Sequence, residues 1–245
     1  MNQSNKQVAR VALVTGAARR IGEAIVRHLH QAGFKVVIHC HQSEKTAQTL
    51  ANQLNLLRLD SALVLNANLC EAAAPHRLIT NTLTWAGRLD LLVNNASIFS
   101  RDSEASWEAL FATNVAAPFR LSHEAYPHLA AHEGAIINLT DIHAEKPLKG
   151  YSIYCQSKAA LALQTKALAL AFAPKVRVNA IAPGAIAWPE GNNALSQEIQ
   201  QKIISTTPLQ RHGDPLVVAE ALLAIALNPF ITGQSLSVDG GRGLC

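Results

Sequence analysis

Tyr154 and Lys158 lie four residues apart in a run rich in alanine and leucine that predicts a helix through Phe172. Residues four apart share one face of a helix, so the ammonium can reach the neighbourhood of the phenol. A free tyrosine titrates near pH 10, and a cation about 4 Å away lowers that pKa by about three units at an effective dielectric near 20. The pair therefore predicts a proton donor that works at neutral pH. A chance pairing on a solvated helix is the alternative interpretation.

A phosphate-binding turn is predicted near the N-terminus. The apolar residues 11–14 indicate a strand, Thr15 and Gly16 a turn, and residues 21–33 an amphipathic helix. Free backbone N–H groups and the positive end of a helix favour a phosphate at such a turn. A second strand follows over residues 34–38. This order predicts a dinucleotide site.

The rest of the chain continues to alternate helices and strands, which is typical of a doubly wound sheet. We predict a helix from Asn114 to residue 129 and another that starts at Asp214 and Pro215. With no repeat or linker, residues 1–245 are expected to form one domain, a Rossmann-type doubly wound parallel sheet of seven strands flanked by helices. The further strands are predicted at 62–65, 89–93, 135–139, 176–181 and 235–238, and the further helices end near 55, 85 and 172.

Composition limits the function classes. The chain is 49% hydrophobic and 16% charged, as a globular protein with buried parallel sheet would be. No apolar run reaches membrane-spanning length and the first residues are polar, so we expect a cytoplasmic protein without a membrane partner. The net charge of +4 comes from scattered Lys and Arg, which favours small anionic molecules over nucleic acid.

No metal site is predicted. His39 and His41 have a two-residue spacing without an accompanying thiol or carboxylate cluster, and His128 and His132 read as exposed positions on a helix. The cysteines have neither pairing nor metal spacing and are expected to be reduced thiols. They are Cys40, Cys70, Cys155 and Cys245.

Four further motifs accompany Tyr154 and Lys158. They are T-G-A-A-R-R-I-G at 15–22, N-N-A-S at 94–97, Asn114, and Pro183 with Gly184. In this order they make the chain resemble the short-chain dehydrogenase/reductase family over nearly its whole length. The resemblance implies that Lys158 also holds the ribose hydroxyls and that Asn114 kinks its helix and links Lys158 to bulk water. It also implies a variable substrate lid at about 185–212, and a homotetramer, which the alanine-rich stretch 159–173 would suit.

The end of the second predicted strand favours NADP over NAD. An NAD enzyme usually carries an acid here for the ribose 2′-hydroxyl, and this chain has none before Glu44. Arg19, His41 and Ser43 could instead hold a 2′-phosphate. We expect cofactor contacts from Gly16, Arg19, Arg20, Ile21, Gly22, His39, His41, Ser43, Asn68, Leu69, Asn95, Ala96, Ser97, Thr140, Tyr154, Lys158, Pro183 and Gly184.

One departure points to a substrate. Most of the family carries a serine thirteen residues before the tyrosine, and this chain has Asp141. The pteridine reductase branch also carries aspartate there, and the chain resembles that branch in Arg20 at the middle-glycine position and in Ser97 and Phe99 after N-N-A. Gln42, where some of the branch place arginine, differs. A loop cap is the alternative role for Asp141, and local packing is the alternative for Phe99.

These residues predict NADPH-dependent reduction of a pterin ring, with Arg20, Ser97, Phe99, Asp141 and Tyr154 at the substrate. The catalytic residues would be Tyr154, Lys158, Asp141 and Asn114. The alternative enzyme is a carbonyl reductase such as a 3-oxoacyl carrier-protein reductase, although the carboxylate of Asp141 would repel a developing alkoxide. A protein that senses NADP or acts as a scaffold is the alternative outside enzymes.

Overall fold

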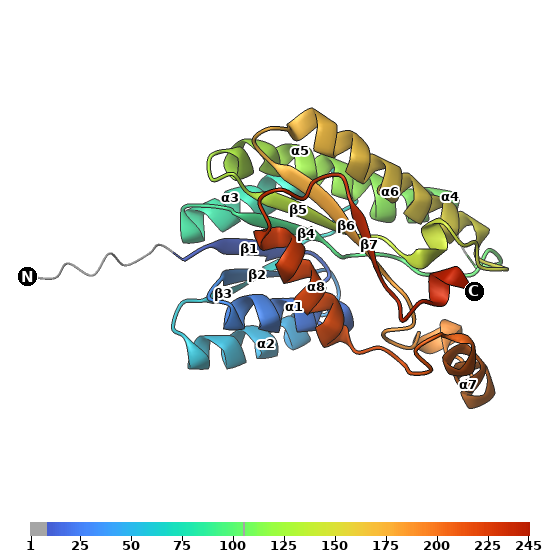
Figure 1. Cartoon of the computed structure of the whole chain (residues 1–245). Helices are drawn as coiled ribbons and strands as arrows, with labels where there is room; N and C mark the ends of the chain where they lie inside the picture. The colour runs from blue at the N-terminus through green and yellow to red at the C-terminus, as the bar shows by residue number, and fades with distance from the viewer. Residues whose placement is uncertain (1–8, 105) are drawn as a thin grey trace, which may run out of the picture.

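The computed structural model describes residues 9–104 and 106–245. Its seven strands form one parallel sheet in the order β3-β2-β1-β4-β5-β6-β7 (Figure 1). The predicted seven-stranded doubly wound sheet is therefore confirmed. The strands are β1 (Val11–Val14), β2 (Lys35–Cys40), β3 (Ala62–Asn66), β4 (Leu91–Asn94), β5 (Ala135–Leu139), β6 (Arg177–Pro183) and β7 (Ser235–Val238).

Helices cover both faces of the sheet because its strands are apolar on both faces. In β1, Ala12 and Val14 pack with α1, α2 and α8, whereas Leu13 packs with α3, α5 and α6 on the other face. Figure 1 shows the same two helical layers. The helices are α1 (Arg20–Gln31), α2 (Glu44–Leu57), α3 (Ala74–Ala86), α4 (Trp107–Phe111), α5 (Ala117–Ala130), α6 (Ser152–Phe172), α7 (Gln197–Thr206) and α8 (Pro215–Leu227).

The strand order reverses between β1 and β4, which are neighbours in the sheet although β2 and β3 separate them in the chain. In open α/β sheets such a switch point leaves a crevice at the carboxyl ends of the strands, where ligands bind. The turn that contains Gly16 follows β1, and the loop that contains Ser97 follows β4. The fold thus brings the two predicted cofactor motifs together.

The prediction that a helix begins at Asn114 is wrong. The chain is already helical from Trp107, where Ser106 caps α4 by accepting a hydrogen bond from the N–H of Ala109 (3.2 Å). Asn114 instead lies in the middle of a π-helical turn, η1 (Ala112–Ala116), between α4 and α5. An extra residue in a helical turn displaces the backbone locally, and such turns are common at functional sites.

The predicted strands at 11–14, 135–139 and 235–238 have the bounds of β1, β5 and β7, and the other predicted boundaries differ from the structure by a few residues. The predicted cap of α8 is confirmed, since Asp214 accepts a hydrogen bond from Leu216 N (2.7 Å). All four cysteines are free. Across residues 9–104 and 106–245, no helix has the length and apolar character needed to cross a membrane. Within the same residues, no group of His, Cys, Asp and Glu side chains could hold a metal ion.

Candidate active site

A cleft of about 920 Å³ lies at the carboxyl ends of the strands. Its lining includes the predicted glycine turn, the end of β2, the loop after β4, Asp141, Tyr154, Lys158 and much of the predicted lid. Asn114 lies behind this wall and is buried. The predicted residues that line the cleft are Gly16, Arg19, Arg20, Ile21, Gly22, His39, His41, Ser43, Asn68, Leu69, Asn95, Ala96, Ser97, Phe99, Thr140, Asp141, Tyr154, Lys158, Pro183 and Gly184.

The turn after β1 packs so closely on the loop after β4 that it needs glycine. Gly16 has φ +60, and a Cβ there would lie 2.9 Å from the Cα of Ala96. A Cβ on Gly22 would lie 2.4 Å from the carbonyl oxygen of Gly16. A side chain at position 16 would push the turn away from Ala96, and one at position 22 would push α1 away from the turn, so the cleft depends on both glycines.

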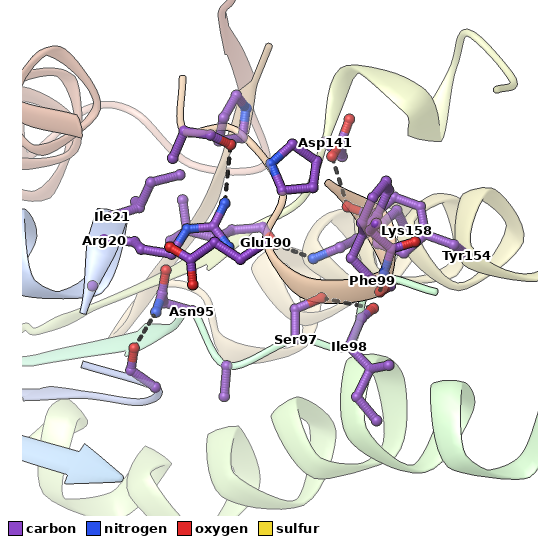
Figure 2. A pocket seen from close by; sticks show the side chains of 18 of the residues that line it. Arg20, Ile21, Asn95, Ser97, Ile98, Phe99, Asp141, Tyr154, Lys158 and Glu190 are labelled. Carbon is purple, nitrogen blue, oxygen red and sulfur yellow. Dashed lines mark hydrogen bonds between the residues drawn. The ribbon is translucent and has the colours of Figure 1, made fainter. Parts of the chain in front are cut away.

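Asn95 holds this turn in place. Its side-chain Nδ2 donates to the carbonyl oxygens of Thr15 (2.8 Å) and Gly16 (2.9 Å), and its backbone N–H donates to the hydroxyl of Thr15 (2.9 Å). The side chain is therefore committed to the backbone of the glycine turn (Figure 2). Asn95 shapes the predicted cofactor site from behind.

Both ring nitrogens of His39 are hydrogen bonded to the backbone, so the side chain has a structural role. Gly16 N donates to its Nδ1 (3.2 Å), and its Nε2 donates to the carbonyl oxygen of Ala67 (3.0 Å). Burial lowers the pKa of His39 to about 4, so the ring is neutral at pH 7 and holds this tautomer. Because both ring nitrogens bond the backbone, the ring fixes the glycine turn against the end of β2.

Arg20 adopts a backbone conformation that favours glycine, with φ +55. This left-handed conformation costs about 1–2 kcal/mol for other residues, which explains the glycine usual at this position. The guanidinium of Arg20 donates to the carbonyl oxygens of Ala187 (2.9 Å) and Trp188 (3.1 Å), which also line the cleft. Arg20 thus ties the glycine turn to the segment that is predicted to be the lid.

The end of β2 presents the groups expected around a 2′-phosphate. Arg19, His41 and Ser43 line this part of the cleft, and Arg19 and His41 are exposed. Glu44, the nearest acid along the chain, accepts a hydrogen bond from the amide of Asn66 (3.1 Å) and is absent from the cleft lining. The Arg19 guanidinium lies 4.0 Å from the Glu190 carboxylate of the lid, in an exposed pair that contributes little.

The remaining predicted cofactor residues form the walls. Leu69, Thr140 and Pro183 are buried, and the Thr140 hydroxyl donates to the carbonyl oxygen of Ile181 (3.0 Å). Asn68 accepts a hydrogen bond from Cys70 N (3.0 Å). A Cβ on Gly184 would lie 2.6 Å from the Cβ of Asp239, so the chain leaves β6 pressed against the end of β7.

Tyr154 and Asp141 are directly hydrogen bonded. The buried Tyr154 hydroxyl donates to Oδ2 of Asp141 at 2.6 Å, as Figure 2 shows. The other carboxylate oxygen accepts from His143 N (2.8 Å) and caps the short helix η2 (Ile142–Ala144). Asp141 therefore caps a loop, as the alternative interpretation expected, and also contacts the predicted proton donor. Its role at the substrate stays a prediction.

The prediction that the pKa of Tyr154 is lowered is wrong in direction. The pKa of Tyr154 is raised well above its ordinary value, first by burial and then by the carboxylate of Asp141. Lys158 Nζ lies 5.8 Å from the centre of the Tyr154 ring and donates to the carbonyl oxygen of Leu139 (2.9 Å). Burial lowers the pKa of Lys158 to about 8. Tyr154 is thus a protonated phenol at neutral pH.

Asn114 uses its amide to join two segments. Its Nδ2 donates to the carbonyl oxygen of Ile98 (3.0 Å) and to the Ser157 hydroxyl (3.0 Å). Its Oδ1 accepts from Ile98 N (2.8 Å) and from the Ser97 hydroxyl (3.1 Å). The side chain therefore fixes the loop after β4 against α6, beside the turn that carries Lys158, and the predicted link from Lys158 to bulk water stays a prediction.

Two aromatic contacts place Phe99 in the wall. Its ring stacks on Tyr151 with the centroids 4.6 Å apart, and its centroid lies 4.8 Å from that of Tyr154 in an edge-on contact. The predicted lid segment also contacts this wall, because Asn193 donates to the carbonyl oxygen of Phe99 (3.0 Å) and accepts from the Tyr151 hydroxyl (3.2 Å). Sequence reasoning missed Tyr151 and Asn193. The three-residue spacing of Tyr151 from Tyr154 was an available signal, whereas Asn193 had none.

Comparisons with known proteins agree with this geometry. A family model described as enoyl-(acyl carrier protein) reductase matches residues 16–242. The 3-oxoacyl-[acyl-carrier-protein] reductase FabG of Staphylococcus aureus is 32% identical over 244 residues, which are 96% of this chain and 98% of the relative.

Two crystal structures superpose on nearly the whole chain, and both are FolM alternative dihydrofolate reductase 1 in complex with NADP. The protein from Brucella suis is 35% identical, with a TM-score of 0.88 over 97% of this chain and 96% of that one. The protein from Brucella canis is 34% identical, with a TM-score of 0.89 over 97% and 95%. The fold, the ordered motifs and these relatives agree, and the chain therefore belongs to the short-chain dehydrogenase/reductase family.

Proposed function

We propose that this protein uses NADPH to reduce the C=N bond of a dihydropterin ring. The observation that carries the proposal is the hydrogen bond from Tyr154 to Asp141 inside the cleft. A carboxyl suits a nitrogen-rich ring, because it accepts from ring N–H groups when ionised and donates when protonated. The similarity to the two Brucella dihydrofolate reductases supports the same class of substrate.

In this mechanism NADPH supplies a hydride to the ring carbon, and the protein supplies the proton. Tyr154 is the proton donor to the ring nitrogen, because its hydroxyl lies in the cleft lining and contacts Asp141 there. Asp141 orients the phenol and binds the edge of the ring. Lys158 is buried, and its ammonium donates to the carbonyl oxygen of Leu139. It would hold the ribose hydroxyls and balance the negative charge left on Tyr154.

The alternative is reduction of a 3-oxoacyl thioester, which the similarity to FabG keeps open. Against it stands Asp141, whose carboxylate would meet the oxygen that becomes negative when a carbonyl accepts hydride. The discriminating experiment follows NADPH oxidation by the purified protein with dihydrobiopterin, dihydrofolate and acetoacetyl thioesters in parallel. Turnover of the dihydropterins is expected, and turnover of the thioesters alone would remove the proposal. No turnover with any of the three would favour a sensing or scaffold role.

We expect the enzyme to prefer NADPH to NADH by at least about tenfold in kcat/KM, which corresponds to about 1.4 kcal/mol. One charge-assisted contact to a 2′-phosphate suffices for that difference. Removing the guanidinium in Arg19→Ala should narrow the preference, whereas Arg27→Ala, on the same helix but outside the cleft lining, should leave it unchanged. Equal kcat/KM values for the two cofactors in the wild type would contradict the assignment.

We expect NADPH to bind more weakly as the pH rises through about 8. Burial lowers the pKa of Lys158 to about 8, so its ammonium is present below that pH and lost above it. The affinity lost with the charge should approach about tenfold per pH unit, as for any single essential protonation. Fluorescence titration of NADPH from about pH 6 to 10 measures this limb, which should be absent in Lys158→Arg because a guanidinium stays charged. A wild-type affinity that is flat across this range would contradict the role of Lys158.

The homotetramer stays a proposal. The predicted face of α6 carries Leu163 and Leu170, which are 69% and 83% exposed in the single chain. Their exposure supports burial against a second copy, since large apolar side chains on one helix face are suited to an interface.

A further inference from the structure

Three cations that the proposed chemistry does not use line the cleft. We define Arg101, Lys149 and Arg242 as the cationic rim. In the part of the chain that the structure describes, none of the three is in an ion pair. The carboxylates in the described lining are those of Asp141 and Glu190. Because one bonds Tyr154 and the other lies beside Arg19, the charge of the rim is uncompensated.

A row of aromatic rings runs from the reacting groups to this rim. Tyr154 meets the edge of Phe99, and Phe99 stacks on Tyr151 with only 12° between the ring planes. The guanidinium carbon of Arg101 lies 5.9 Å from the centre of the Tyr151 ring. A substrate whose ring reacts at Tyr154 can therefore extend its side chain along this row toward Arg101.

Arg242 reaches the rim from the C-terminal turn η4 (Arg242–Leu244), which packs against η2. The ammonium of Lys146 donates to its carbonyl oxygen (3.1 Å), and its own guanidinium donates to the carbonyl oxygen of Ile203 in α7 (3.4 Å). The first contact holds the backbone of Arg242 against the segment that follows η2, and the second holds its half-buried side chain against α7 in the predicted lid. Three separate segments thus contribute cations to the lining of the cleft.

We propose that the cationic rim binds an anionic group, a carboxylate or a phosphate, on the side chain of the substrate. This inference rests on the proposed pterin reduction and adds a basis for choosing among dihydropterins. Charge-assisted hydrogen bonds are about twice as strong as neutral ones, so one such contact changes affinity by about tenfold or more. Docking of an acidic carrier protein is the competing use of the same charges. The aromatic row favours a small-molecule tail, because it continues from the rim to Tyr154 inside the cleft.

The test compares three substrates that share one ring. Dihydrobiopterin has an uncharged side chain, dihydrofolate carries carboxylates, and dihydroneopterin phosphate carries a phosphate. In Arg101→Gln/Lys149→Gln and in Arg242→Gln we expect KM to rise about tenfold or more for the anionic substrate that the wild type prefers, and to stay within about twofold for dihydrobiopterin. The anionic substrate whose KM rises more identifies the charged group, carboxylate or phosphate, on the side chain of the natural substrate. The matched control is Lys175→Gln, which changes an exposed lysine just before the amino end of β6, whereas the cleft lies at the carboxyl ends of the strands.

A second readout needs no variant. Raising the salt concentration should increase KM for the anionic substrates of the wild type and leave dihydrobiopterin unchanged, because salt screens exposed charges. If KM changes equally for charged and uncharged substrates, or does not change, the proposed binding of an anionic tail by the rim is wrong. The proposed pterin reduction would be unaffected by that result. If the rim variants lose activity only when the substrate is an acetoacetyl group on acidic acyl carrier protein, the rim binds a carrier protein and the proposed anionic tail is overturned. No turnover of any dihydropterin would overturn the proposed function itself.

Discussion

Tyr154→Phe should lower kcat for dihydropterin reduction by about a hundredfold or more, because general-acid catalysis typically contributes 10²–10⁴-fold. The substitution removes one oxygen from a buried ring, and that oxygen makes the 2.6 Å contact with Asp141. The ring itself remains to pack against Phe99, so the wall of the cleft should persist. Steady-state kinetics at saturating NADPH measure the loss.

Tyr126→Phe is the control for this prediction. It removes the same oxygen from a ring on α5 that packs on Phe172, outside the cleft lining. Its kcat should equal that of the wild type, and NADPH should bind both variants with wild-type affinity. Wild-type turnover by Tyr154→Phe would remove the phenol from the mechanism.

Asp141→Ser should abolish most dihydropterin reduction, with a loss of about a hundredfold or more in kcat/KM, while NADPH binds as before. Serine restores the residue usual in the family and can still cap η2, because its hydroxyl can accept from His143 N as the carboxylate does. What disappears is the carboxylate that contacts Tyr154. The loss should therefore appear in the chemistry and in pterin binding rather than in stability.

Two further variants separate charge from shape. Asp141→Asn keeps the shape and the cap but not the charge, and it should be nearly as slow as Asp141→Ser if the carboxylate acts on the ring. Asp214→Ser makes the same change at another helix cap, at the start of α8 and outside the cleft lining, and it should retain activity. If Asp141→Ser still reduces dihydropterins, the carboxylate has no part in the reaction and Asp141 serves only to cap η2.

Much of the fold followed from local patterns. Parallel strands buried on both faces are continuous apolar runs, so β1 and β5 were predicted with their exact bounds. The beginning of the helix before Asn114 was missed because a π-helical turn interrupts its periodicity. The cap at Ser106 was the available sign that α4 starts earlier.

The site was predicted less completely, because its geometry joins segments that are distant in sequence. Motif order indicated Tyr154, Asp141 and the glycine turn, and all of them line one cleft. The structural role of His39 depends on Ala67, a contact that no local pattern encodes. The pKa of Tyr154 was predicted in the wrong direction because spacing gives the position of Lys158 but neither the burial nor the Asp141 contact that dominates.

Isotope labelling of NADPH shows which molecule receives the hydride. NADPH carrying deuterium at both C4 positions is incubated with the protein and a dihydropterin, and the products are analysed by mass spectrometry. The account predicts a tetrahydropterin that has gained a single deuterium on carbon, with a yield that falls in Tyr154→Phe. Unlabelled dihydropterin recovered intact, with deuterium found instead in a 3-hydroxyacyl thioester when an acetoacetyl thioester is supplied, would contradict it.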